Sequence, residues 1–213
     1  MKKYITVAAC SLFILTAATL EAQDSPTRQD KLYSMSGIGF SFPVGESADY
    51  LKPKFSTSLG LNLGLGNKGL FLYPKVSLHA YGYQELTPDE GYSYSLKKAR
   101  TTTYLLNLAL GYRHINGKFA WYGFAGAGGG IILTPRITID QSNHLATLDN
   151  KSNGMAMVEA GLGTEYNIGG ASLFIESSYM QGFSKIQNRS FSAVPLTIGI
   201  KPNLSKLFNN KNK

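Results

Sequence analysis

The sequence predicts an all-β protein, an eight-stranded antiparallel transmembrane up-and-down β-barrel. Three observations lead to this fold class. Several segments alternate between apolar residues and small or polar residues, which is the period of a β-strand. Long polar connections and tight turns follow these segments in strict alternation. Past the first residues no run is apolar enough for a membrane helix, so a membrane span has to be a closed barrel.

Residues 1–22 have the pattern of an export signal. Two lysines open the chain, a mostly apolar stretch runs to Leu20, and Leu20 to Ala22 resembles the small-residue cleavage site of secretory signals. We expect cleavage after Ala22, which leaves 23–213 as a single barrel domain. Cys10 leaves with the signal, so the mature chain has no disulfide, thiol nucleophile or cysteine-bound metal.

The clearest strand is the sequence YLLNLALGY at 104–112. Its outward face is expected to carry Leu106, Leu108 and Leu110, flanked by Tyr104 and Tyr112. The segment spans roughly 27 Å at about 3.4 Å per residue. A strand tilt of about 40° reduces its rise to roughly 20 Å, close to the apolar band of a membrane barrel with an aromatic residue at each boundary.

The next clearest strand, 55–65, separates a membrane barrel from a soluble one. Leu59, Leu61 and Leu63 share one face, and serine, glycine and asparagine share the other. A soluble, lipocalin-like barrel would carry many lysines and glutamates on its polar face, which meets water. Small, uncharged side chains suit a crowded interior, so the leucines are predicted to face lipid.

The same alternation predicts eight strands, and the even count places both termini on one side. The longest connection is expected at 134–153, further polar connections at 45–54, 84–98 and 184–190, and a local bulge at Pro74. The aromatic girdles are expected to hold Tyr104, Tyr112, Trp121 and Tyr122. The predicted strands are about 32–42, 55–65, 70–83, 101–113, 119–133, 155–167, 171–181 and 191–201.

These features, with strand phrases such as LTIGIK at 196–201, resemble the small outer-membrane barrel domains of Gram-negative bacteria, in particular the barrel half of the outer-membrane protein A group. The resemblance implies an integral protein of the outer membrane and cell envelope, porin-like in form. One departure concerns the C-terminus. Such chains usually end on an aromatic residue, whereas here the last strand is followed by Pro202 to Lys213, with Phe208 as the only aromatic residue. The charge of Lys201 is counted with this basic tail.

Charged residues on the inward faces form the main candidate site. An eight-stranded barrel is just wide enough for side chains to fill it, and buried charges have to pair to offset desolvation. We therefore predict a cross-lumen ion-pair network that plugs the barrel. An ion path or gate is the alternative use of the same charges. The predicted network consists of Lys75, His79, Arg113, Glu159, Glu165 and Glu176.

No catalytic residue, cofactor-binding residue or metal ligand is predicted. Ser77 and His79 share a strand face and are a pair that a lipid-modifying barrel enzyme would need, but that face points into the lumen. The three histidines do not have metal-ligand spacing. The net charge of +8 is spread over loops and tail, which excludes a nucleic-acid patch.

The predicted function is a structural or interaction role in the outer membrane as a monomer. A narrow channel or small-ligand transporter is the second reading, and a lipid-modifying enzyme the third. The expected partners are outer-membrane lipids and lipopolysaccharide, with an envelope or extracellular protein as a further partner of the loops. The connection 84–98 carries charges of both signs that suit such contacts.

Overall fold

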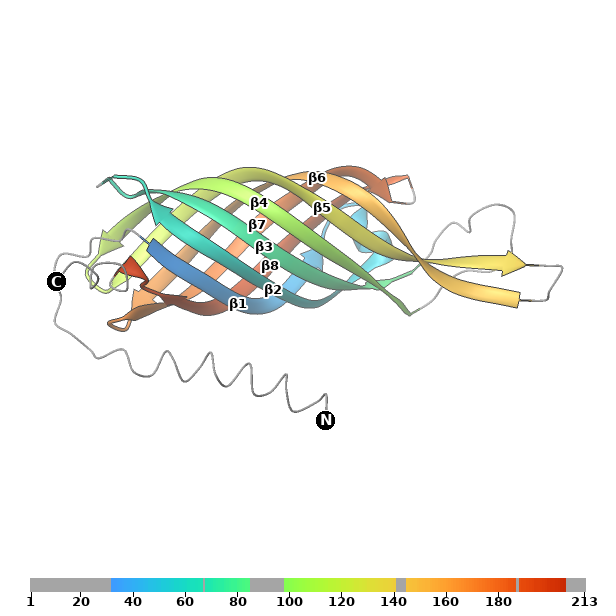
Figure 1. The fold of residues 1–213 in the computed structure, drawn as a ribbon, viewed down its shortest axis with the longest axis horizontal. Coiled ribbons are helices and arrows are strands. Elements are labelled where there is room, and N and C mark those ends of the chain that lie inside the picture. Colours follow the sequence, from blue (N-terminus) through green and yellow to red (C-terminus); the bar gives the residue numbers. More distant parts are fainter. Residues whose placement is uncertain (1–31, 67, 85–97, 141–144, 187, 206–213) are drawn as a thin grey trace, which may run out of the picture.

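The computed structural model confirms the predicted fold class, a closed antiparallel barrel (Figure 1). It describes residues 32–66, 68–84, 98–140, 145–186 and 188–205. The expected signal 1–22 with its cleavage site, most of the connection 84–98 and the end of the basic tail lie outside these ranges. No helix among the described residues is long and apolar enough to cross a membrane.

Each strand pairs with the next along the chain, and β1 pairs with β8 to close the ring. One four-residue helix, α2 (Ser47–Tyr50), lies between β1 and β2. The strands are β1 (Leu32–Pro43), β2 (Leu51–Gly64), β3 (Leu70–Tyr83), β4 (Ala99–Asn116), β5 (Phe119–Asp140), β6 (Leu145–Asn167), β7 (Ala171–Ile186) and β8 (Arg189–Pro202).

The two ends of the barrel differ. At the end where β1 begins and β8 ends, tight turns join β2 to β3, β4 to β5 and β6 to β7. At the other end, which carries α2, β5 and β6 project beyond the other strands as a long hairpin (Figure 1).

This hairpin corrects the expected connection at 134–153, because β5 and β6 stay paired as far as Asp140 and Leu145. The expected loop at 184–190 is likewise mostly strand, and β2 begins at Leu51 rather than at 55. The strand ends were predicted from the apolar face of each strand, which is shorter than the strand itself. β-branched residues such as Ile137 continue the strand beyond it by their preference for extended backbone.

The bulge expected at Pro74 is absent. β2 and β3 keep one register on either side of the proline, with Gly60 opposite Lys75 and Leu63 opposite Leu72. The missing N–H therefore costs local pairing with β2 but inserts no extra residue. A bulge occurs instead in β2, where the register shifts between Pro53 and Ser56.

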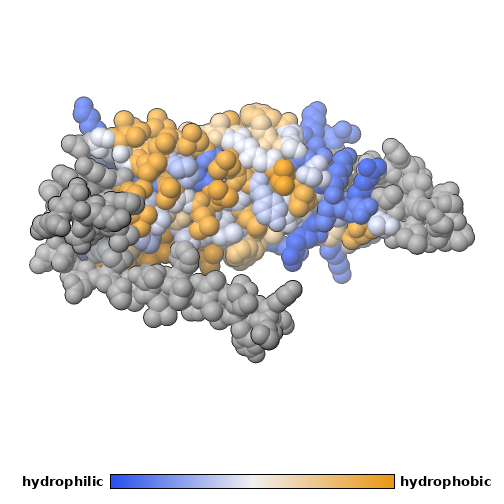
Figure 2. Space-filling view, in the orientation of Figure 1, coloured by the Kyte–Doolittle hydropathy of each residue, from blue (hydrophilic) through white to orange (hydrophobic). Residues whose placement is uncertain are grey.

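The outer wall carries a belt of large apolar side chains, and a hydrophilic band lies beside this belt, at the end of the barrel that carries α2 (Figure 2). More than half of the surface is exposed in each of Ile38, Phe40, Leu162 and Ile198, at 56%, 58%, 72% and 55%. In a water-soluble fold most such residues would be buried. In this barrel the outer wall is apolar, whereas the charged residues Lys75, Glu159, Glu165 and Glu176 are buried inside.

The interior holds two apolar clusters. The cluster near the termini consists of Met35, Phe71, Tyr73, Ala109, Tyr122, Phe124 and Phe174. The cluster near α2 includes Tyr50, Leu51, Tyr81, Met155 and Phe191. Glycines make room for the rings, because a Cβ at Gly163 would collide with Tyr122 and one at Gly111 would collide with Phe71.

The two ends of the described chain are tied together beside the β1–β8 seam. The backbone N–H of Leu204 donates to the carbonyl of Leu32 at 2.9 Å, and that of Asn203 donates to Gly170 at 2.9 Å. The Asn203 side chain also donates to the Tyr33 hydroxyl at 3.2 Å. The segment after β8 therefore extends the ring of hydrogen bonds at this end.

Candidate functional site in the barrel interior

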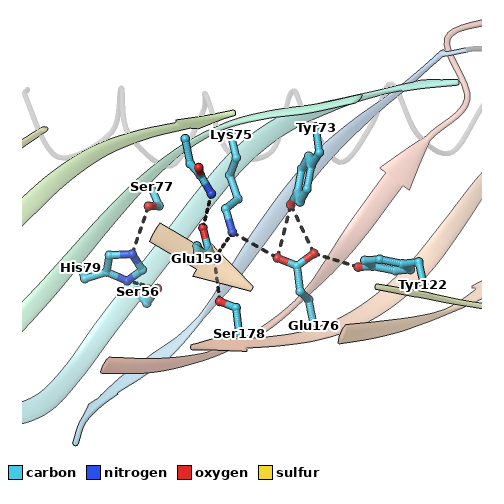
Figure 3. Close-up of polar contacts among 10 residues, drawn as sticks. Ser56, Tyr73, Lys75, Ser77, His79, Tyr122, Glu159, Glu176 and Ser178 are labelled. Atoms are coloured by element: carbon cyan, nitrogen blue, oxygen red, sulfur yellow. Dashed lines mark hydrogen bonds and ion pairs between the residues drawn. The ribbon is translucent and has the colours of Figure 1, made fainter. Parts of the chain in front are cut away.

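The first group of interior charges is centred on Lys75 of β3 (Figure 3). Its Nζ atom lies 2.5 Å from Glu159 Oε1 on β6 and 3.4 Å from Glu176 Oε1 on β7. All three side chains are at most 5% exposed. A single cation therefore holds two carboxylates that come from the opposite wall.

Neutral donors complete the coordination of both acids. Asn107 donates to Glu159 Oε2 at 2.5 Å, and Ser178 donates to Oε1 at 2.6 Å. The hydroxyls of Tyr122 and Tyr73 donate to Glu176 at 2.9 Å and 3.3 Å (Figure 3). These bonds replace water around the charges, as a buried ion pair requires.

The second group is centred on an acid, Glu165 of β6. Lys201 of β8 places Nζ 2.8 Å from Oε2, and Arg113 of β4 places Nε 3.2 Å from Oε1. Arg113 also donates through Nη2 to the Asn62 side chain. Lys201 Nζ lies 5.0 Å from the centre of the Tyr33 ring, which adds a cation–π contact.

The structure thus divides the six predicted interior residues into three sets. Lys75, Glu159 and Glu176 form one group, and Arg113 and Glu165 belong to the other. His79 stands apart: its ring is hydrogen-bonded to Ser56 Oγ at 2.8 Å and to Ser77 Oγ at 3.1 Å (Figure 3).

Two residues of these groups were missed or misplaced by the sequence analysis. Lys201 was assigned to the basic tail, yet its side chain is fully buried. Alternation along β8, with Ile198 and Ile200 outward, would have placed it inside. Tyr122 was expected in a girdle beside Trp121 but is 1% exposed, because neighbouring residues of a strand face opposite sides.

The remaining predicted wall residues lie on the outside. Tyr104, Tyr112 and Trp121 are 46%, 48% and 57% exposed. Of the six leucines expected to face lipid, Leu63 is partly exposed and the others are exposed. Those five are Leu59 at 58%, Leu61 at 41%, Leu106 at 61%, Leu108 at 54% and Leu110 at 52%.

A third polar group fastens α2 across the mouth of the barrel. Glu46 Oε2 accepts hydrogen bonds from the backbone N–H and the hydroxyl of Ser190 at 2.7 Å and 2.8 Å. The backbone bond, then the hydroxyl bond, lowers the pKa of Glu46 below its ordinary value. Ser47 Oγ accepts from the N–H of Ser192 at 2.7 Å, so α2 is bonded directly to β8.

The arrangement offers little for catalysis or metal binding. Ser77 and His79 are hydrogen-bonded, but the other ring nitrogen meets Ser56 rather than an orienting carboxylate, and both residues are buried in the interior. Within the described ranges no three histidine, cysteine or acidic residues are grouped to hold a metal ion.

Comparison with solved structures finds barrels of the same form. Neisserial surface protein A aligns with a TM-score of 0.55 at 11% identity, over 81% of this chain and 96% of that one. The chain has the fold of the small eight-stranded outer-membrane barrels. No family model and no curated protein matches the sequence.

Two further structures align at lower scores. The attachment invasion locus protein Ail of Yersinia pestis, solved with the heparin analogue sucrose octasulfate, aligns with a TM-score of 0.46 at 17% identity over 80% of this chain and 99% of that one. The N-terminal barrel of OprF from Pseudomonas aeruginosa aligns at 0.40 and 13% identity, over 81% and 98% of the two chains.

Proposed function

We propose that the chain is an integral outer-membrane barrel with a structural or interaction role and an interior closed by its two ion-pair groups. The observation that carries the proposal is the inversion of polarity, with leucines on the wall and paired charges inside. Exposing that belt to water would cost about 25 cal/mol for each Å². Burial of the belt in a bilayer removes this cost. The export signal expected at 1–22 would direct the chain out of the cytoplasm, where it can reach the outer membrane.

The proposal that the interior is closed is supported by the side chains that fill it. Aromatic clusters occupy it near both ends, and charges between and beside them are bonded to one another rather than left to solvate a passage. A pore lined for ion conduction would instead need charges that face water. The wall contacts outer-membrane lipids, and the connections at the α2 end are the surface for an envelope or extracellular protein.

Membrane location is tested by fractionating cells that express the chain and by detergent-gel migration with and without heating. We expect the mature chain, beginning at Gln23, in the outer-membrane fraction, and a shift in migration on heating as the barrel unfolds. A detergent-free soluble monomer in the periplasm would contradict the proposal.

Closure is tested in planar lipid bilayers with the purified barrel. A plugged interior predicts no steady single-channel conductance at any potential that the bilayer tolerates. Steady ohmic steps that change when Lys75 is replaced by methionine would instead establish the narrow channel. A mass shift of lipid A that depends on Ser77 would establish a lipid-modifying enzyme.

A further inference from the structure

The bulge in β2 changes the direction of one basic side chain. Pro53 lies opposite Tyr81 and Ser56 opposite His79, so two residues, Lys54 and Phe55, share the place opposite the single residue between them on β3. Both side chains are exposed on the outer wall. Strict alternation would have turned one of them inward, and the bulge therefore adds a cation to the outside.

Lys54 joins two other cations on neighbouring strands. Lys52 of β2 lies opposite Gly82 of β3, and Gly82 lies opposite Arg100 of β4, so the three positions form one row across the wall. Lys52 and Arg100 are also exposed. A Cβ at Gly82 would lie 3.4 Å from Lys52 Cβ and 3.6 Å from Lys54 Cε. The side chain of Lys54 therefore lies over the backbone of Gly82.

No acid neutralises this cationic row from its own strands. β2, β3 and β4 contain no aspartate or glutamate. Glu46 and Asp49, at the same end of the barrel, are bonded toward β8, to Ser190 and Arg189 respectively. Among the described residues of these strands, Lys52, Lys54 and Arg100 therefore form a row of three positive charges with no acid in it, which favours an anionic ligand.

The height of the row matches the headgroup layer of a bilayer. Tyr104, at the boundary of the belt, lies opposite Leu78. Lys54 is about two residues higher and Arg100 four residues higher, or roughly 5 Å and 10 Å of rise at about 3.4 Å per residue and a 40° tilt. The headgroup layer is about 5–7 Å thick on each side, and long basic side chains reach back toward it.

We propose that Lys52, Lys54 and Arg100 bind the phosphate groups of an anionic lipid in the leaflet at the α2 end. This inference rests on the proposed membrane location. A lipid fits better than free phosphate because exposed Phe55 and Tyr104 lie directly below the cations, where acyl chains attached to the same headgroup would pack. The ligand class is a phosphorylated lipid headgroup, with diphosphoryl lipid A as the probe.

The test measures lipid binding to the purified barrel in mixed micelles by native mass spectrometry, with diphosphoryl lipid A and its dephosphorylated form as paired probes. We expect preference for the phosphorylated form. Binding should weaken roughly fivefold for each cation removed and about a hundredfold for Lys52→Gln, Lys54→Gln and Arg100→Gln together. Lys54→Gln alone should account for one such factor.

The matched control removes three other exposed lysines, Lys68→Gln, Lys118→Gln and Lys185→Gln, so that the total charge change is equal. Unchanged binding by this control and weakened binding by the test variant support the site. Equal weakening by both shows a general charge effect and overturns it. So does equal binding of the dephosphorylated lipid, or displacement of lipid A by excess inorganic phosphate.

Failure of this inference is distinguishable from failure of the proposed function. A barrel that fractionates with the outer membrane but shows no phosphate preference overturns only the lipid site. A chain that is absent from the membrane fraction overturns the proposed function, and with it the premise of the site. Heat-dependent gel migration of each variant verifies that the barrel has formed.

Discussion

The two interior charge groups are mirror images in composition. In one, a single cation, Lys75, holds two acids, whereas in the other a single acid, Glu165, holds two cations. With every group ionised, one carries an excess negative charge and the other an excess positive charge. Tyr122 joins them, because its hydroxyl donates to Glu176 while Lys201 Nζ lies 5.4 Å from its ring centre.

The central and outer members of each group are not equivalent. Removing the central residue leaves two buried like charges without the opposite charge that balances them, which is strongly destabilising. Removing an outer residue leaves a neutral pair that is still bonded. The sign of the central residue differs between the groups, but this ranking of centre over periphery should hold in both.

The largest effect is expected for Glu165→Gln, which leaves Arg113 and Lys201 buried without a carboxylate. We expect a loss of about 3–5 kcal/mol in the free energy of unfolding. Urea unfolding in phospholipid vesicles, followed through the fluorescence of the single tryptophan, Trp121, measures it. The exposed acid Asp149, replaced by asparagine, is the control and should change stability by less than about 0.5 kcal/mol.

A smaller loss is expected for Glu176→Gln. Lys75 keeps Glu159 at 2.5 Å, so a neutral pair remains, and the amide oxygen still accepts from Tyr122. The expected loss is about 1–2 kcal/mol in the same unfolding assay. A loss equal to that of Glu165→Gln would show that centre and periphery do not differ.

Smaller again is the effect of Tyr122→Phe, which keeps the ring between the two groups and removes only the 2.9 Å hydrogen bond to Glu176. Glu176 retains Tyr73 and Lys75, so the expected loss is about 1 kcal/mol. Tyr104→Phe, which removes an exposed hydroxyl, serves as the control. If the two variants are equally stable, the link between the groups contributes nothing to stability.

The smallest effect lies at the mouth of the barrel, outside the belt. Because the folded pKa of Glu46 is depressed, its stabilisation is present above the ordinary value and is lost as pH falls through the folded pKa. The protection factor of the Ser190 amide, which is its intrinsic exchange rate divided by the observed rate, should therefore fall as the pH drops through the folded pKa of Glu46. Glu46→Gln should remove this pH dependence. A wild-type amide with the same protection above and below the folded pKa of Glu46 would contradict a stabilising bond between Glu46 and Ser190.

Sequence alternation was sufficient for the fold and for the side of the wall on which most residues lie. Leu106, Leu108 and Leu110 differ so clearly from Asn107 and its neighbours that one period assigns both faces. Alternation was not used to separate Tyr122 from Trp121, because the glycine-rich segment after them has few side chains that could assign the faces of this strand. It was not applied at Lys201, where composition pointed to a tail.

The pairing of interior charges was harder to predict than their direction. All six interior charges were predicted to form one network. Counted in residues from the tight turns, Lys75, Arg113, Glu165 and Glu176 lie at similar depth. Strands of a barrel tilt and are staggered around the ring, so equal distance from a turn is not equal height. Lys75 therefore meets Glu159, and Arg113 meets Glu165.

The hydrogen bond between Leu204 and Leu32 makes a circular permutant of the barrel possible. Because Leu32 and Leu204 are hydrogen-bonded beside the seam, a short peptide linker can join them once the residues beyond them are removed, and new ends can be opened between β2 and β3. In such a circular permutant β2 and β3, rather than β1 and β8, would hold the chain ends and pair to close the barrel. Assembly of the permutant would show whether the order of strands, rather than their final ring, directs insertion.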